Sequence, residues 1–129
     1  MTEAKKLPPR ELKVTIGPNT YSIAFPKNAK LIDIEVRKLH VTNGMHKDLL
    51  FGSVASREAY LAVESACTFE ILIPELKTDM NVTSLFDLDL FQSKQVVKAY
   101  ENYYAWMEEW REALNDEARK LKTEEKKDE

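Results

Sequence analysis

Three groups of residues carry side chains that could do acid–base or metal chemistry. The first is the carboxylate cluster at Glu108, Glu109 and Glu112. Two neighbouring carboxylates can act as general acid and base where a cleft raises the pKa of one of them. Here basic residues from Arg111 to Lys120 are interleaved with the acids, which is typical of an exposed helix with ion pairs along its surface. The pattern therefore favours a solvated helix over a catalytic pair.

The other two groups are candidate metal ligands, and their spacing does not match a metal site. His40 and His46 are six residues apart, whereas zinc sites use closer ligands and usually thiolates. Asp79, Asp87 and Asp89 lie in a stretch without glycine, although a calcium loop needs a glycine at its sharp turn. We expect one histidine near a helix end and the other in a loop, we expect the aspartates to cap helices and solvate turns, and we predict no metal.

Other catalytic patterns are also missing from the sequence. The chain has only three glycines, widely separated, and therefore no glycine-rich phosphate loop. No serine lies in a nucleophile-elbow context. The single cysteine, Cys67, lies in an apolar helical stretch, which favours a buried thiol over a reactive one. It cannot form an internal disulfide, which fits a reducing compartment. We predict a protein that is not an enzyme and has no cofactor.

Composition narrows the class of partner. The chain has 129 residues, of which 43% are hydrophobic and 32% charged, which suits one domain with its own core. A net charge of −3 leaves no excess of base to neutralise phosphates, so nucleic acid is not expected as a partner. No apolar run approaches the roughly 18 residues of a membrane span, and residues 1–13 lack the apolar region of a signal peptide. The expected partners are proteins.

The elements that would position any site begin with a hairpin. Residues 1–10 are polar, contain Pro8 and Pro9, and are predicted to be a flexible lead-in. Apolar residues then alternate with others on both sides of a turn at residues 17–20, namely at Leu12, Val14, Ile16, Tyr21, Ile23 and Phe25. This alternation predicts a β-hairpin with one strongly apolar face. That face must pack on helices or on another chain, because a lone hairpin is only marginally stable in water.

Helical spacing dominates the rest of the chain. A helix is predicted over residues 29–42, with Asn28 as its N-cap and an apolar side formed by Leu31, Ile32, Ile34, Val36 and Leu39. A second is predicted over residues 56–73 and ends before Pro74, with an apolar face formed by Leu61, Ala62, Ser65, Ala66, Phe69 and Ile73. Residues 74–92 are expected to be a loop with one short helical turn, capped by Thr83 or Ser84.

The last predicted helix, over residues 96–121, has the clearest pattern. Its apolar residues recur at alternating spacings of four and three, at Val96, Tyr100, Tyr103, Met107, Trp110 and Leu114. The fold class expected is therefore α+β: a hairpin, then three to four helices ending in a long one. Residues 11–121 form the single domain, and residues 122–129 a charged, solvated tail.

The aromatic residues of this last helix are more numerous than one buried face accommodates. Tyr100, Tyr103 and Met107 suit a core under the hairpin and the first two helices. Trp106 and Trp110 leave two alternatives open, packing within the fold or contact with a partner, because Trp and Tyr are favoured anchors at protein interfaces. The predicted partner-binding residues are Tyr103, Trp106, Trp110 and Leu114.

Short segments of the chain resemble a known family. They are Tyr-Ser-Ile-Ala-Phe-Pro at residues 21–26, Lys-Leu-Ile-Asp-Ile-Glu-Val-Arg-Lys at 30–38, Leu-Ile-Pro-Glu-Leu at 72–76, Val-Val-Lys-Ala-Tyr at 96–100 and Ala-Trp-Met-Glu-Glu-Trp at 105–110. Over residues 11–114 the chain resembles the tail-assembly chaperones of long-tailed bacteriophages.

The resemblance implies a role in phage morphogenesis. It implies binding to the tape-measure or tube protein in the host cytoplasm, without catalysis or a cofactor. The alternative is a structural subunit that stays in the virion as part of the neck, ring, connector or tail. Such a subunit would assemble through its hairpin and long helix, including as a homo-oligomer.

Overall fold

A two-stranded antiparallel hairpin begins the fold, as predicted. The computed structural model describes residues 7–127, and the side chains of residues 7–121. Strand β1 (Glu11–Ile16) pairs with β2 (Asn19–Ala24) in a register that runs from Glu11 opposite Ala24 to Ile16 opposite Asn19. Gly17 has a φ of 60° at the first position of the two-residue turn. Glycine adopts this conformation without strain, whereas Pro18 holds its own φ near −65°.

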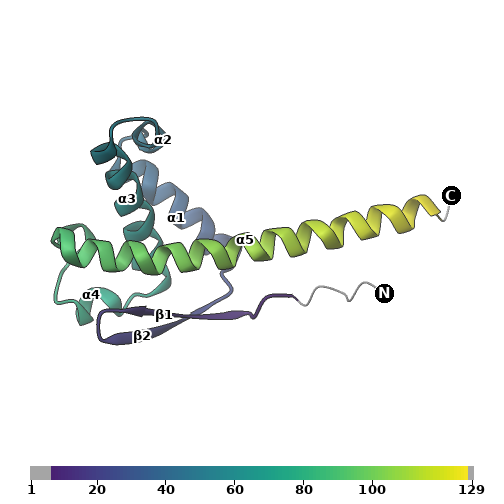
Figure 1. Ribbon diagram of the computed structural model, residues 1–129, viewed down its shortest axis with the longest axis horizontal. Coiled ribbons are helices and arrows are strands. Elements are labelled where there is room, and N and C mark those ends of the chain that lie inside the picture. Colours follow the sequence, from purple (N-terminus) through teal and green to yellow (C-terminus); the bar gives the residue numbers. More distant parts are fainter. Residues whose placement is uncertain (1–6, 128–129) are drawn as a thin grey trace.

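In the described residues, five α-helices and one 3-10 turn follow the hairpin, so the protein is α+β. They are α1 (Asn28–Val41), α2 (His46–Leu50), α3 (Val54–Leu72), α4 (Leu76–Asp79), the 3-10 turn η1 (Leu85–Asp87) and α5 (Leu90–Lys127). Figure 1 shows α5 crossing the whole molecule, with the hairpin along one side and α1 and α3 on the other. This arrangement places α5 between two layers.

The predicted boundaries are close to the observed ones, with two corrections. Asn28 is the first residue of α1 rather than its N-cap, which is Lys27. Helix α5 begins at Leu90, six residues earlier than predicted, because Asp89 and Gln92 cap it reciprocally. The Asp89 carboxylate accepts from the Gln92 backbone N–H at 2.8 Å, and the Gln92 side chain accepts from the Asp89 N–H at 3.4 Å. The predicted end of α3 before Pro74 is confirmed.

The main core joins the apolar face of the hairpin to α3 and α5. The hairpin contributes Val14, Ile16, Tyr21 and Ile23, each at most 6% exposed, which confirms the predicted face. On the other side Phe69 of α3 is fully buried. The predicted burial of Cys67 is also confirmed, and burial raises the pKa of its thiol to about 11.

The apolar side predicted for α1 is wrong in part. The helix is buried through Ile34 and Lys38, not through the row Ile32, Val36 and Leu39. These three side chains are 60%, 59% and 51% exposed. We call them the α1 row.

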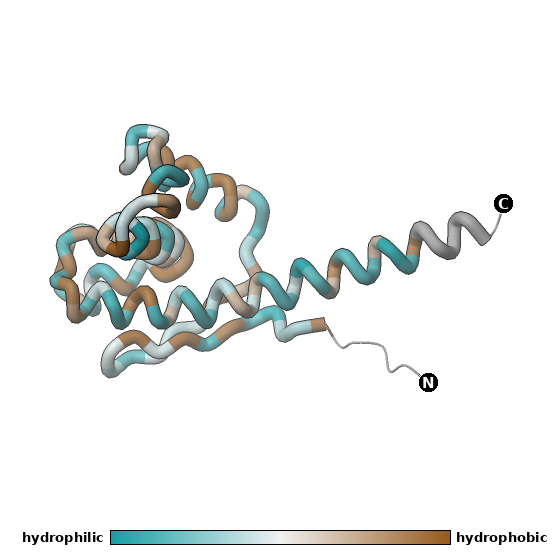
Figure 2. Tube along the Cα trace, turned by 45° about the horizontal axis from the view of Figure 1, so that its top comes forward, coloured by the Kyte–Doolittle hydropathy of each residue, from teal (hydrophilic) through white to brown (hydrophobic). Residues whose placement is uncertain are grey.

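Helix α5 continues past the body of the molecule. Among the side chains described up to residue 121, Ala113 is the last buried one, and Leu114 and Leu121 are 50% and 61% exposed. The end of the helix projects beyond the body in Figure 1, and the coloured part of this projection in Figure 2 is mostly hydrophilic. The backbone of the predicted tail is helical through Lys127, whereas the side chains of residues 122–129 lie outside the described part.

Candidate functional site

Three of the four predicted partner-binding residues belong to the protein's own core. Tyr103, Trp106 and Trp110 are 6%, 4% and 2% exposed, and only Leu114 is open to solvent. Of the two alternatives left open for Trp106 and Trp110, packing within the fold is therefore the one observed. The seam residues from Val96 to Trp110 are buried, as a core requires.

The chain's own N-terminal segment covers the two tryptophans. The ring of Phe25, at the end of the hairpin, lies 5.9 Å from Trp106 and 4.4 Å from Trp110 between centroids. Both indole N–H groups donate to the carbonyl oxygen of Pro9, at 2.8 Å and 3.1 Å. The Arg10 guanidinium stacks over Trp110 at 5.7 Å. Pro9 and Arg10 of the predicted flexible lead-in are therefore held against α5, whereas residues 1–6 lie outside the described part.

A buried polar cluster lies on the other side of α5, and sequence reasoning missed it. Glu64 of α3 is 7% exposed. Its carboxylate accepts from the Lys38 ammonium at 2.5 Å and from the Tyr100 hydroxyl at 2.8 Å, and it lies 2.8 Å from Nε2 of His46. The His46 ring stacks on Tyr60 with centroids 4.4 Å apart. One carboxylate thus joins side chains from α1, α2 and α5 to α3.

The charges in this cluster compensate one another. Burial opposes ionisation of Glu64, but hydrogen bonds from Lys38 and His46 outweigh it and lower the pKa of the carboxyl. Burial, with the nearby carboxylate, raises the pKa of Tyr60 to about 12, and the pKa of Tyr100 rises further. The cluster therefore holds an ionised carboxylate beside neutral phenols. Such an arrangement fastens four helices together, whereas a general acid needs a carboxyl with a raised pKa.

Three of the other sequence candidates also have structural partners. Asp79 accepts from the Tyr21 hydroxyl at 2.8 Å, and Asp87 accepts from Thr83 at 3.2 Å. Glu108 forms an exposed ion pair with Arg111, as expected for a solvated helix. In the part of the chain that the structure describes, no group of three or more His, Cys, Asp and Glu side chains could hold a metal ion.

A second buried carboxylate, Glu70, fastens the segment between α4 and α5. It accepts from the backbone N–H of Leu85 at 2.6 Å and from the Ser84 hydroxyl at 3.2 Å, and it pairs with Arg37. The Ser84 hydroxyl also accepts from the Phe86 N–H, so Ser84 is the cap of the short turn. The position of this turn fixes where α5 begins.

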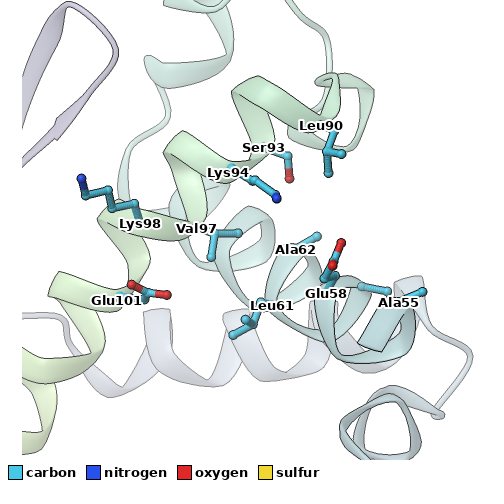
Figure 3. A pocket seen from close by; sticks show the side chains of 11 residues that line it. Ala55, Glu58, Leu61, Ala62, Leu90, Ser93, Lys94, Val97, Lys98 and Glu101 are labelled. Carbon is cyan, nitrogen blue, oxygen red and sulfur yellow. The ribbon is translucent and has the colours of Figure 1, made fainter. Parts of the chain in front are cut away.

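A groove with a mostly apolar lining lies between α3 and α5. Its volume is about 630 Å³. The apolar lining comes from Ala59, Leu61 and Ala62 of α3 and from Leu90 and Val97 of α5 (Figure 3). We call it the α3–α5 groove. Its small α3 side chains would allow another helix to approach closely.

Charged side chains border the α3–α5 groove on both sides. Glu58 stands on the α3 side, and Lys94, Lys98 and Glu101 stand on the α5 side. Figure 3 shows Lys94 and Glu58 reaching toward the space between the helices from opposite walls. An apolar floor between charged rims suits a side-on helix with an apolar stripe and charged flanks.

A second, shallower hollow follows α1. It has a volume of about 420 Å³ and includes the α1 row together with Leu31, Asn28 and Glu35. The three side chains of the α1 row are more than half exposed although they are strongly apolar. Contiguous exposed apolar surface of this kind marks protein interaction sites on other proteins.

Comparison of the chain with protein-family models, with curated proteins and with solved structures finds no match. Within residues 7–127, none of the helices combines the length and the apolar character that crossing a bilayer demands.

Proposed function

We propose that this protein is a non-enzymatic assembly factor that binds an apolar segment of another protein, in the manner of a tail-assembly chaperone of tailed bacteriophages. The observation that carries the proposal is the α1 row, whose side chains Ile32, Val36 and Leu39 are more than half exposed on a helix that is otherwise anchored in the fold. The partner we propose is a tail component, the tape-measure or tube protein, whose apolar surface is covered until assembly.

The chemistry of the α1 row supports binding of an apolar helix or strand. Residues at positions i, i+4 and i+7 lie on one face of a helix. On the opposite side of α1, Lys38 is held by Glu64 and Arg37 by Glu70. The row is therefore presented on a helix fixed in place by buried ion pairs. A preformed apolar face binds without a large cost of ordering its own side chains.

A structural subunit of the virion is the second candidate, and the hairpin favours it. In the described residues the sheet has two strands, so each strand has one edge that pairs with no other strand. An extended segment of a neighbouring subunit could add to such an edge. Mass spectrometry of finished virions separates the two candidates, because a chaperone is absent from them and a subunit is abundant.

Co-expression tests the chaperone proposal directly. Each tail protein encoded by the same genome is expressed alone and together with this protein, and its soluble fraction is measured. We expect one of them to be soluble only in the co-expression and to co-purify. The double variant Val36→Asp/Leu39→Asp should lose that effect, because two charges cannot enter an apolar interface without partners.

The matched control is Lys30→Asp, which changes an exposed α1 side chain outside the row. It should leave solubilisation unchanged. If no tail protein gains solubility, or if the double variant solubilises its partner as well as the unmodified protein does, the proposal is refuted.

A further inference from the structure

We infer that the projecting end of α5 in one copy docks into the α3–α5 groove of a second copy, so that the protein self-associates head to tail. We call the projecting residues 114–127 the arm. The inference concerns a surface other than the α1 row and does not depend on the proposed chaperone function.

The arm carries an apolar stripe beyond the core. Leu114, Ala118 and Leu121 occupy positions i, i+4 and i+7 of α5 and thus share one face. The two leucines are 50% and 61% exposed, although Leu114 continues the seam that is buried up to Trp110. The last positions of the seam therefore lie beyond the body, and the leucine side chains there are exposed.

The arm and the groove match in size and in charge. Fourteen residues of helix are about 21 Å long, which exceeds the length of the α3 segment from Ala55 to Ala62 that lines the groove. Glu117 borders the apolar stripe and would face Lys94, whose side chain reaches into the groove. The floor of alanines offers room for the two leucine side chains.

The groove of the same molecule cannot receive the arm. Residues Leu90 to Glu101 line the groove and belong to the same uninterrupted helix as the arm. No proline or glycine occurs between Leu90 and Lys127 to bend that helix back. The occupant must therefore come from another molecule. A contact between two different surfaces is heterologous, and its repetition produces an open chain or a closed ring.

Two variants block the two halves of this contact. The groove variant Ala59→Arg places a long side chain on the groove floor, at an exposed position where folding does not depend on the alanine. The arm variant Leu114→Glu/Leu121→Glu charges the stripe. The matched control Ala105→Arg makes the same substitution at an exposed position of α5 outside the groove. Circular dichroism melting confirms that each variant is folded.

Light scattering on a sizing column gives the mass of each species over a range of concentrations. We expect the unmodified protein and the control to exceed the monomer mass of 14.9 kDa as concentration rises. Each blocked variant should remain a monomer. A mixture of the two should form a one-to-one dimer and nothing larger, because one has a free groove and the other a free arm.

Three results would overturn the inference. They are a monomeric unmodified protein at every concentration, self-association that survives Ala59→Arg, and a mixture of the two variants that stays monomeric. The second would point to a contact between two arms instead of between arm and groove.

Discussion

Both layers on either side of α5 pack against it through apolar side chains, and the α1–α3 layer adds a buried ion cluster. The hairpin layer meets α5 through apolar and aromatic side chains, with Phe25 packed against Trp106 and Trp110. The α1–α3 layer meets it around a buried carboxylate, Glu64, with Lys38 as its cationic partner. One helix thus serves two interfaces that should respond differently to mutation and to pH.

The difference lies in what each layer loses when one member is removed. An apolar contact loses its transfer free energy and leaves a cavity. A member removed from a buried ion cluster also leaves its former partners desolvated and unpaired. The hairpin layer should therefore depend on shape, and the α1–α3 layer on complete pairing.

The largest effect is expected in the hairpin layer. Trp110→Ala should destabilise the protein by about 3–5 kcal/mol, because it removes a fully buried indole. Chemical denaturation monitored by circular dichroism gives the free energy of unfolding. The matched control is Tyr104→Ala on the same helix, where the ring is 51% exposed and the loss should be much smaller. Equal losses for the two variants would contradict the placement of Trp110 in the core.

The next effect is expected in the α1–α3 layer. Glu64→Gln should cost roughly 2–4 kcal/mol, because it leaves the buried Lys38 ammonium with only the exposed carboxylate of Glu35. The double variant Lys38→Met/Glu64→Gln should recover part of that loss, since it contains neither charge. If the double variant is less stable than Glu64→Gln by the full cost of Lys38→Met alone, the two residues are not coupled.

The smallest effect we expect is a difference in how acid changes the contribution of each layer to the free energy of unfolding. The pKa of Glu64 is lowered in the folded protein from its ordinary value of 4.5, so its ionised form stabilises the fold above that pH. This contribution is lost as the pH falls through the lowered pKa. The stability gap between the unmodified protein and Glu64→Gln should therefore narrow below about pH 4.5. The gap for Trp110→Ala should stay constant, and a parallel narrowing of both would contradict the assignment.

Local sequence pattern was sufficient where an element is buried on one face by regular packing. The alternation from Leu12 to Phe25 predicts the hairpin and its buried face, and the spacing from Val96 to Trp110 predicts the buried seam. The residues at which helices begin and end were harder to predict. The reciprocal cap of Asp89 and Gln92 could have been recognised from its spacing of three residues.

Contacts between distant residues could not be predicted from the pattern. From the sequence alone, Lys38 is expected at the surface. In the fold it is buried against Glu64, which lies 26 positions later in the chain. The burial of Lys38 turns α1 so that Ile32 and Val36 face solvent. In the same way, the cover over Trp106 and Trp110 comes from Pro9, which is about a hundred residues away in sequence.

The shared carbonyl of Pro9 has a mechanical consequence. Strand β1 and helix α5 lie alongside each other, and the chain enters and leaves the body at the same end of the molecule (Figure 1). A load that pulled the two ends apart would act first on the two indole hydrogen bonds to Pro9. It would then break the contacts between β1 and α5 in sequence, starting from the end that carries Pro9, instead of loading all of them at once. The protein should therefore yield at low force from its ends while remaining stable in solution.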